Sequence, residues 1–455
     1  MQDFNSTPEF SNIGERPAGA VILGGAHGSL AVARSLGRRG VPVWFVTNDH
    51  PIAKYSRYVP RSFDWPGPQD EQAASAWLME LARRYGLDDW TLFAGGDEEV
   101  RLVAHHHATL DRVFRLTTPR WKTAQFACDK RLTYQHASNV RVDCPLSLYP
   151  RDRREVATAP LRFPIILKPS YRMSRNAFTN AKAWRADDRE SLLARYDEAV
   201  PLVGNDAIVL QELIPGAGEA QFSYAGVWDK GAPVASFVVR RSRQYPIDFG
   251  FTSTFVETVD QPEIKDAAHR FLASLHFSGL VEVEFKYDHR DRKYKLLDVN
   301  PRPWTWIGLG EAAGVDLPWI QWALSRGEPA PASKPYASAA WAHASRDAIA
   351  AAQLVAHKSL RVKKYLGSWG QMKTWAAFAT DDPLPGVMDL PVVAARVLKR
   401  RFSRTTTAQL MSFVRRAGFP AHSGAASFDA VSGMARAKTA KAASATTPSE
   451  TKAAE

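Results

Sequence analysis

The chain has little of what secreted and membrane-spanning proteins need. Only two of its 455 residues are cysteines, Cys128 and Cys144, so neither a disulfide framework nor a cysteine-based metal cluster is expected. We expect both to be small residues of the core or near the surface, in a reducing compartment. No window of about 18 apolar residues occurs that would span a membrane, and the N-terminus lacks a basic-then-apolar signal peptide. We therefore expect a cytoplasmic protein.

Motifs that recognise nucleic acids are missing as well. There is no zinc-finger spacing and no aromatic RNA-binding motif, so we expect no nucleic-acid partner. The formal net charge is nevertheless +12, of which residues 401–455 supply +5 through eight Lys/Arg against three Asp/Glu. The remaining positive charge is typical of a protein that handles anionic substrates such as nucleotides.

The most informative stretch is residues 279–302, which reads as a β-hairpin. Apolar and charged residues alternate on both sides of a polar turn, with the period of half-buried strands. Pairing around a five-residue loop places Glu284 opposite Asp298. The same register places Glu282 opposite Asn300, on the same face.

Acidic residues that face each other on a sheet destabilise it unless something positive lies between them. Carboxylate and amide oxygens are the ligands that Mg²⁺ takes and shares with substrate phosphates. The pattern therefore suggests a metal site at Glu284, Asp298 and Asn300, with Arg302 nearby. The alternative is a solvent-facing acidic stripe, which is common on exposed sheets.

The N-terminal region reads as a βαβ unit. Residues 20–23 form an apolar strand, and Gly24, Gly25 and Gly28 allow a tight turn with close approach to a ligand. An apolar helix face and a second strand follow. The glycine pattern is not the full dinucleotide fingerprint, and no acidic residue closes the second strand, so NAD is disfavoured. A purely structural turn is the alternative.

Two further polar groups follow predicted strands. Asp97 lies at the carboxyl end of strand 90–94, where open α/β sheets bind ligands. It either holds a substrate amine or caps the next helix, and the cap is favoured. Three arginines within residues 240–243 would stabilise a transferring phosphoryl group and a carboxylate. Strand alternation favours Arg243 for this role, against the alternative of a basic edge strand.

The hairpin is similar to the metal-binding end of the ATP-grasp superfamily. There, a glutamate on one strand and a Glu/Asp-x-Asn-x-Arg run on the next hold two Mg²⁺ over the ATP phosphates. The matching positions are Glu284, Asp298, Asn300 and Arg302, with Asp298 standing where glutamate is more usual. The similarity covers about residues 21–330. It is closer still to the carboxylate–amine ligase branch, which includes D-aspartate ligase-like proteins.

The resemblance implies ATP and Mg²⁺ as cofactors, with Mn²⁺ as an alternative ion. It gives Arg302 a catalytic role, in addition to the role expected for Arg243. It also implies that the loop with His27 and Gly28 faces a second substrate, which Asp97 would bind as well. The nucleotide would bind to Lys130, Lys168, Gln211, Glu212, Ile214 and Glu219. The family's flap over the phosphates is often glycine-rich, whereas residues 170–176 contain no glycine, which leaves open whether this loop covers them.

We therefore expect an α/β (α+β) chain with a helical C-terminal extension. The expected parts are a disordered start at 1–17, a Rossmann-like pre-ATP-grasp domain at 18–118, a two-lobed ATP-grasp domain at 119–330, the extension at 331–403 and a disordered basic tail at 404–455. An amphipathic basic stretch near the end of the extension would pack on the body or make weak contact with a membrane surface, and packing is favoured.

The expected function is ATP-dependent ligation of a small-molecule carboxylate to an amine through an acyl phosphate, with release of ADP and phosphate. One alternative is an ATP-binding regulatory or scaffold protein without turnover. Another is a different ATP-grasp chemistry such as carboxylation. A homo-oligomer is compatible with the sequence, which does not identify the acid or the amine.

Overall fold

The structure is a computed structural model that describes residues 18–170, 176–181, 183–247, 252–333 and 338–397. The expected disordered start, most of the glycine-free loop and the basic tail lie outside the described residues. The chain up to Val392 belongs to one compact unit, and a second unit begins at Val393. Residues 393–397 of the second unit are described, and they are helical.

The N-terminal part is built on a parallel sheet, as the βαβ pattern predicts. Its three central strands are short apolar runs, which is typical of strands buried on both faces, whereas the two edge strands are partly exposed. In the described residues the order is β3 (Arg61–Asp64), β2 (Val43–Thr47), β1 (Ala20–Leu23), β4 (Thr91–Ala94) and β5 (Arg115–Leu116). Neighbouring strands pair in parallel throughout, and apolar side chains are buried on both faces.

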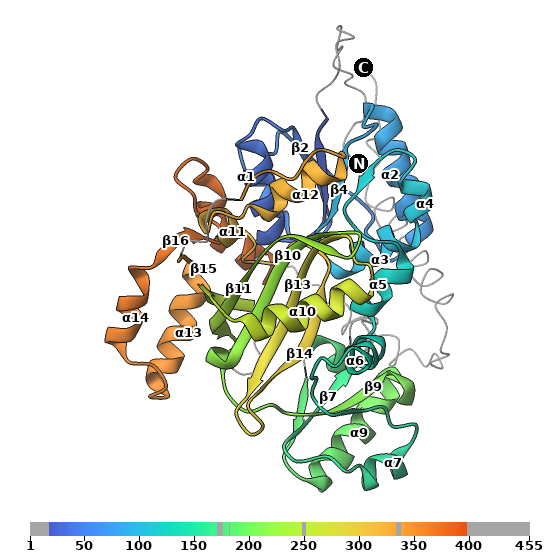
Figure 1. Cartoon of the computed structure of the whole chain (residues 1–455), viewed down its shortest axis with the longest axis vertical. Helices are drawn as coiled ribbons and strands as arrows, with labels where there is room; N and C mark the ends of the chain where they lie inside the picture. Colours follow the sequence, from blue (N-terminus) through green and yellow to red (C-terminus); the bar gives the residue numbers. More distant parts are fainter. Residues whose placement is uncertain (1–17, 171–175, 182, 248–251, 334–337, 398–455) are drawn as a thin grey trace, which may run out of the picture. The chain divides into compact units, whose positions relative to one another are not determined.

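Helices cover this sheet (Figure 1). They are α1 (His27–Gly37), η1 (Pro51–Tyr55), α2 (Glu71–Tyr85), α3 (Asp97–His105) and α4 (His107–Leu110). Asp70 caps the start of α2 by accepting from Ala73 N, and Gly86 ends it in the left-handed conformation, which glycine adopts without strain. The local sequence thus sets both ends of this helix.

The central part is a larger, mainly antiparallel sheet. In the described residues its order is β14 (Lys293–Asn300), β13 (Gly279–Asp288), β10 (Gln221–Asp229), β11 (Ala232–Tyr245), β12 (Thr252–Val259), β15 (Ala340–Ala342) and β16 (Met372–Trp375). One face packs on α10 (Pro262–Ser274). The other packs on α11 (Leu309–Ala312) and α12 (Leu317–Ser325). Because α12 also contacts α1, it ties this sheet to the N-terminal part.

A smaller lobe lies between these two parts in the sequence. Its antiparallel sheet has the order β6 (Ser147–Leu148), β9 (Ile208–Glu212), β7 (Ile165–Pro169) and β8 (Trp184–Ala186). The helices of this region are α5 (Trp121–Cys128), α6 (Lys130–Asn139), α7 (Arg153–Thr158), α8 (Ala177–Asn180), α9 (Arg189–Val203), η2 (Asn205–Ala207) and η3 (Gly218–Ala220). The lobe has its own apolar core beneath α9.

The residues after 330 contain more than the expected helices. Helices α13 (Ala344–Ala356) and α14 (Val362–Trp369) form, and residues 384–397 are helical. Strand β15 also pairs with β12, and β16 pairs with β15, so the extension adds these two strands to the edge of the central sheet. Val392 is buried and Met388 packs against the N-terminal core, in keeping with packing of the amphipathic stretch.

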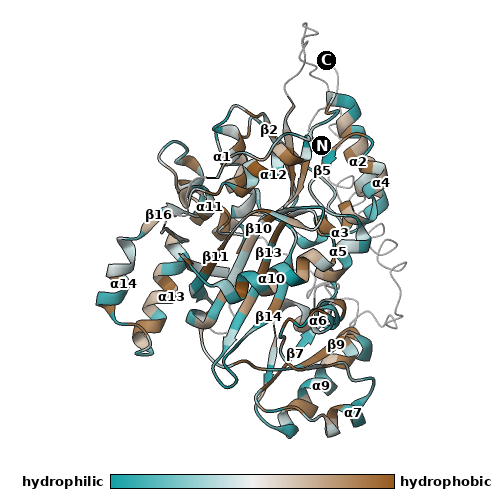
Figure 2. Ribbon diagram, in the orientation of Figure 1, coloured by the Kyte–Doolittle hydropathy of each residue, from teal (hydrophilic) through white to brown (hydrophobic). Residues whose placement is uncertain are grey.

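The expected α/β class with a helical C-terminal region is confirmed, while the domain boundaries stay predictions. Figure 2 shows the central strands largely brown and the solvent-facing sides of α2 and α10 largely teal, as the hydrophobic effect requires of a sheet covered by amphipathic helices. Among the described residues, no helix has the length and apolar character needed to cross a membrane.

Candidate active site

The hairpin of β13 and β14 carries the acidic face that the sequence predicts. Glu284 pairs with Asp298, and Glu282 pairs with Asn300. Because side chains of directly opposed residues point to the same side of a sheet, these four polar side chains gather at one end of the hairpin. The predicted register is confirmed.

The chain reaches this register by a different route from the predicted five-residue loop. The last pair before the turn is Asp288 with Lys293, so four residues form the loop. One extra residue, Leu297, then makes a bulge in β14. The bulge restores the register that a longer loop would have produced, and it lies beside the acidic face, where bulges commonly re-aim functional side chains.

Hydrogen bonds join the acidic residues into one network. The Asn300 amide nitrogen donates to Glu282 Oε2 and to Glu284 Oε1, both at 3.1 Å. Ser223 on β10 donates its hydroxyl to Glu282 Oε1 at 2.9 Å. Glu282 and Asn300 are buried, so the network holds its carboxylates in fixed positions in a region of low dielectric constant.

Basic side chains from two other elements neutralise the acidic face. Lys130 Nζ, at the start of α6, lies 2.8 Å from Asp298 Oδ2. Arg241 on β11 forms a buried ion pair with Glu284. The site thus contains the positive charge that opposed carboxylates require, and the role of Lys130 in binding phosphate stays a prediction.

Arg302 connects the hairpin to the N-terminal part. It follows β14, donates through Nη2 to Asn300 Oδ1 at 3.3 Å and pairs through Nε with Asp97 at the start of α3. A Cβ added at Gly28 would lie 2.7 Å from the carbonyl oxygen of Trp304. Only glycine lets α1 approach this closely, so Gly28 is packed against the segment that follows Arg302.

Burial and charge shift the protonation of this cluster. Burial, and then the neighbouring charge of Glu284, raises the pKa of Glu282 to about 7. Burial alone would lower the pKa of Lys130, but the charge of Asp298 reverses this and holds the pKa above its usual value. Lys130 therefore stays positively charged, whereas Glu282 exchanges its proton near pH 7. Shifted pKa values of this kind are common at functional sites.

The donor set fits a magnesium ion. Glu284, Asp298 and Asn300 offer carboxylate and amide oxygens on one face, and the side chains of Glu284 and Asp298 are partly exposed. Mg²⁺ is bound in proteins by one or two such carboxylates together with water and phosphate oxygens. The Asn300 amide nitrogen faces Glu282 and Glu284 while its oxygen accepts from Arg302, so the amide would turn over to present its oxygen to a cation.

Comparisons with known proteins identify the fold that holds this site. Residues 227–345, which include the hairpin, match a family model described as "ATP-grasp in the biosynthetic pathway with Ter operon". The chain has the ATP-grasp fold. The sequence-based resemblance to this superfamily is thereby confirmed. No curated protein matches the sequence.

Several solved structures share the ATP-grasp fold of this chain. An L-amino acid ligase from Bacillus licheniformis is 15% identical, with a TM-score of 0.55, over 72% of this chain and 80% of that one. N5-carboxyaminoimidazole ribonucleotide synthetase from Thermus thermophilus is 18% identical, with a TM-score of 0.53, over 70% and 82%. Biotin carboxylase from Campylobacter jejuni is 14% identical, with a TM-score of 0.55, over 70% and 74%.

The small lobe of the ATP-grasp fold brings three of the predicted nucleotide residues together. Lys168 Nζ, on β7, donates to Gln211 Oε1 on β9 at 2.7 Å. Gln211 donates in turn to the Ser147 hydroxyl at 2.9 Å. The backbone nitrogen of Lys130 donates to Ser170 O at 3.3 Å, so the two lysines approach from neighbouring elements.

Of the other predicted nucleotide residues, Glu212 ends β9, and Ile214 and Glu219 follow it. Glu212 accepts from the Arg162 backbone nitrogen at 3.2 Å, and Ile214 is buried. Glu219 lies in η3, where it accepts from Ala217 N at 3.3 Å. All three lie on the chain that leads from the small lobe to the large one, and their nucleotide roles stay predictions.

The structure places Arg243 away from the acidic hairpin. Its guanidinium forms two hydrogen bonds of 2.8 Å with the Asp347 carboxylate on α13 and lies 4.0 Å from the centre of the Phe255 ring. Both Arg243 and Asp347 are buried. These contacts give Arg243 a structural role, and the catalytic role expected for it has no support among them. Arg241, two residues earlier, takes the position beside Glu284.

The residues expected to face a second substrate divide into two groups. Asp97 and Gly28 lie at the end of the acidic hairpin, as described above. Asp97 is the first residue of α3 and not its cap, because Gly96 holds the cap position, so the favoured capping interpretation is corrected. His27 is buried and bonds to Asp389 at 2.8 Å, within another cluster.

Sequence reasoning did not single out Glu99. This residue of α3 is 9% exposed, and burial raises its pKa to about 7. A Cβ at Gly24 would lie 2.3 Å from Glu99 Oε1, so the glycine-rich turn after β1 makes room for this carboxyl group. In the sequence, Glu99 is the second of two adjacent glutamates after Asp97. This pattern does not distinguish a buried glutamate from one on the exposed side of a helix.

Proposed function

We propose that this ATP-grasp protein is an ATP-dependent ligase that joins a carboxylate to an amine. The observation that supports the proposal is the convergence of Glu284, Asp298 and Asn300 with Lys130 and Arg302 at one end of the hairpin. Oxygen ligands for Mg²⁺ beside cations for phosphate are the parts that phosphoryl transfer needs.

In the proposed reaction, a carboxylate oxygen of the substrate attacks the γ-phosphorus of ATP, and ADP leaves. The amine nitrogen then attacks the carbonyl carbon of the acyl phosphate, phosphate leaves and the amine loses one proton. Mg²⁺, when bound, would neutralise the negative charge of the phosphate oxygens. Each step moves charge between anionic oxygens, so the protein acts mainly by positioning and by fixed charge.

The side chains divide this work by position. Lys130 and Lys168 would bind phosphate oxygens as point charges, and Gln211 orients Lys168. Glu284, Asp298 and Asn300 would hold the ion. Arg302, fixed by Asp97, would stabilise the charge that develops on the acyl phosphate.

A screen for ADP release tests the proposal. The full chain is incubated with ATP, Mg²⁺, single carboxylic acids, single amines and acid–amine pairs, and products are identified by mass. The variant Glu284→Gln serves as the inactive reference, and Asp143→Asn, which changes an exposed carboxylate paired with Lys293, serves as the matched control.

ADP release that requires both an acid and an amine, with an amide as product, supports the ligase. ADP release that requires bicarbonate, with a carboxylated product, contradicts the ligase and supports carboxylation. Tight binding of a non-hydrolysable ATP analogue without ADP release from any pair would favour a nucleotide-binding regulator or scaffold.

A further inference from the structure

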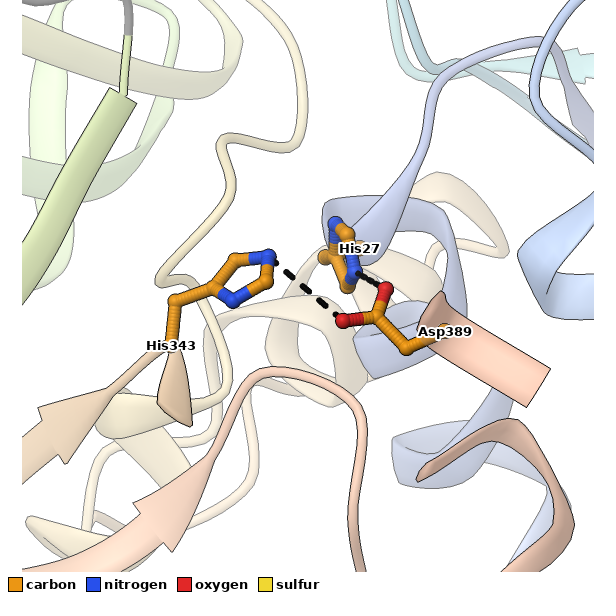
Figure 3. Close-up of side chains that lie close together, drawn as sticks. All are labelled: His27, His343 and Asp389. Atoms are coloured by element: carbon orange, nitrogen blue, oxygen red, sulfur yellow. Dashed lines mark hydrogen bonds and ion pairs between the residues drawn. The ribbon is translucent and has the colours of Figure 1, made fainter. Parts of the chain in front are cut away.

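Three side chains from distant parts of the sequence meet in a buried cluster outside the acidic hairpin. His27 begins α1, His343 directly follows β15, and Asp389 lies on the helix that starts at residue 384. Their exposed fractions are 2%, 1% and 6%. Figure 3 shows both imidazole rings turned toward the Asp389 carboxylate.

The distances within the cluster fit a metal site. His27 Nε2 lies 2.8 Å from Asp389 Oδ1, and His343 Nε2 lies 3.9 Å from Asp389 Oδ2. One ligand atom from each residue lies within 4.8 Å of the other two. Around an ion with bonds of about 2.0–2.2 Å, ligand atoms are roughly 3.3 Å apart, a value that lies within the observed spread.

His343 gives evidence for a metal site that does not depend on these distances. Its Nε2 atom is buried and has no hydrogen-bond partner among the described residues, and the 3.9 Å distance to Asp389 is too long for one. A buried ring nitrogen left unbonded costs free energy and calls for a ligand. The backbone of His343 is held in place, because His343 N donates to Thr254 O at 2.9 Å. A simple His27–Asp389 hydrogen bond leaves this nitrogen unexplained.

A cavity opens onto the same cluster. It has a volume of about 360 Å³, and its lining includes His343, Asp389, Ser345, Trp375 and Phe378. Two of the three cluster residues therefore form part of its wall. An ion held by three protein ligands would keep a coordination position open toward this cavity, as catalytic and substrate-binding metal sites do.

We propose that His27, His343 and Asp389 bind a divalent transition-metal ion of the Zn²⁺ type, with an open position facing the cavity. Imidazole nitrogens select such ions, whereas Mg²⁺ prefers oxygen ligands. The site is therefore distinct from the acidic hairpin in both residues and metal class. It does not rest on the ligase reaction, and its test needs no nucleotide.

The test uses the full chain after chelator treatment and dialysis. Zn²⁺ and, separately, Mg²⁺ are titrated by calorimetry, bound metal is counted by elemental analysis, and Co²⁺ is added to record its visible spectrum. The wild type should bind one Zn²⁺ per chain at this cluster and no Mg²⁺ there, and Co²⁺ should give the absorption of a site with nitrogen and oxygen ligands.

The variants His343→Gln and Asp389→Asn should each weaken Zn²⁺ binding at least about 100-fold, since each removes a ligand, whereas losing a group that only orients a ligand costs about 10–100-fold. The control His136→Gln removes a histidine bonded to Ser274 elsewhere and should bind as the wild type does. Zn²⁺ should also raise the melting temperature of the wild type and the control, but not that of the ligand variants.

Charge provides a second check. Arg346 acts electrostatically on both His343 and Asp389, so its positive charge opposes a bound dication. Arg346→Gln should therefore tighten Zn²⁺ binding about threefold or more at low salt. The proposal is overturned if the wild type binds no Zn²⁺ at about 0.1 mM, a concentration well above the Kd of a site with a binding free energy of about 10 kcal/mol, or if Asp389→Asn binds it as tightly as the wild type.

Discussion

At the scale of single residues, two arginines of one strand have different surroundings. Arg241 and Arg243 are both buried, but β11 is irregular between Arg240 and Arg243, which pair with Glu257 and Phe255 of β12. Arg241 pairs with Glu284 of the acidic hairpin, whereas Arg243 pairs with Asp347 of α13. Strict alternation would put both arginines on one side of the sheet, whereas the extra residue in β11 turns Arg243 to the side of its partner Phe255.

This difference predicts opposite effects of the same substitution. Arg241→Met should weaken binding of a magnesium–ATP analogue complex at least about tenfold, because it removes a cation that positions Glu284, and should change thermal stability less. Arg243→Met should leave that binding within about threefold of the wild type. It should lower stability by about 3–5 kcal/mol, because it leaves Asp347 buried and unpaired.

Calorimetric titration and thermal melting separate the two effects. The assignment fails if Arg243→Met loses analogue binding while remaining as stable as the wild type, or if Arg241→Met affects stability alone.

At the scale of elements, the hairpin shows how far sequence reasoning reaches. Its strands and the cross-strand pairs of Glu284 and Asn300 follow from alternation, because a period of two fixes which side chains share a face. The four-residue loop and the bulge at Leu297 do not follow, since two compensating changes give the same register. The parallel N-terminal sheet was likewise predictable from its short apolar strands.

Contacts between distant segments were not predictable in the same way. His27 and Asp389 are 362 residues apart, and strand β15 spans only three residues. No local periodicity encodes such a pairing, because it depends on how the extension packs on the rest of the chain. The partners of His27 and Arg243 therefore could not be predicted from the sequence, although the two residues themselves could be singled out.

The hairpin turn contains a charge cluster whose effect depends on pH. Hydrogen bonds from Arg290, and then from Lys295, hold the pKa of the buried Asp288 well below its usual value. The ionised carboxylate therefore adds stability that is fully present above its unfolded pKa of about 4. That stability is lost as the pH falls from there toward the lower pKa of the folded state.

Asp288→Asn should accordingly destabilise the protein at pH 7, by about 1–3 kcal/mol for charge-assisted hydrogen bonds. The difference from the wild type should shrink steadily below about pH 4. Urea midpoints at pH 7, 5, 4 and 3 measure it, with Asp143→Asn as the surface control. A difference that stays constant down to pH 3 would contradict the assigned role.

At the scale of the whole molecule, residues near the end of the first unit bind residues near its beginning. Asp382 accepts hydrogen bonds from Arg34 Nε at 2.9 Å, from Ser56 Oγ at 2.7 Å and from Arg57 N at 2.9 Å. Asp381 binds Arg38 and Tyr58 beside it. The C-terminal extension thereby fixes the α1 region that contains both His27 and Gly28.

Breaking these contacts should loosen the extension. Asp382→Asn leaves the buried Arg34 without its counter-ion, which costs about 3–5 kcal/mol for a buried pair. The melting temperature should fall by several degrees, and limited proteolysis should cut within residues 376–392 sooner. Glu80→Gln, which changes an exposed pair with Arg83, should do neither. Unchanged cleavage and melting in Asp382→Asn would show that these contacts contribute little.

We infer that the hairpin carboxylates hold the metal ion that binds ATP. Calorimetric titration of a non-hydrolysable ATP analogue, with and without Mg²⁺, tests it most directly in the wild type, Glu284→Gln and Asp143→Asn. We expect Mg²⁺ to tighten analogue binding in the wild type and in Asp143→Asn. In Glu284→Gln most of that gain should be lost, with affinity at least about tenfold weaker, because a ligand to the ion is gone. Affinity within twofold of the wild type, with the same dependence on Mg²⁺, would contradict the account.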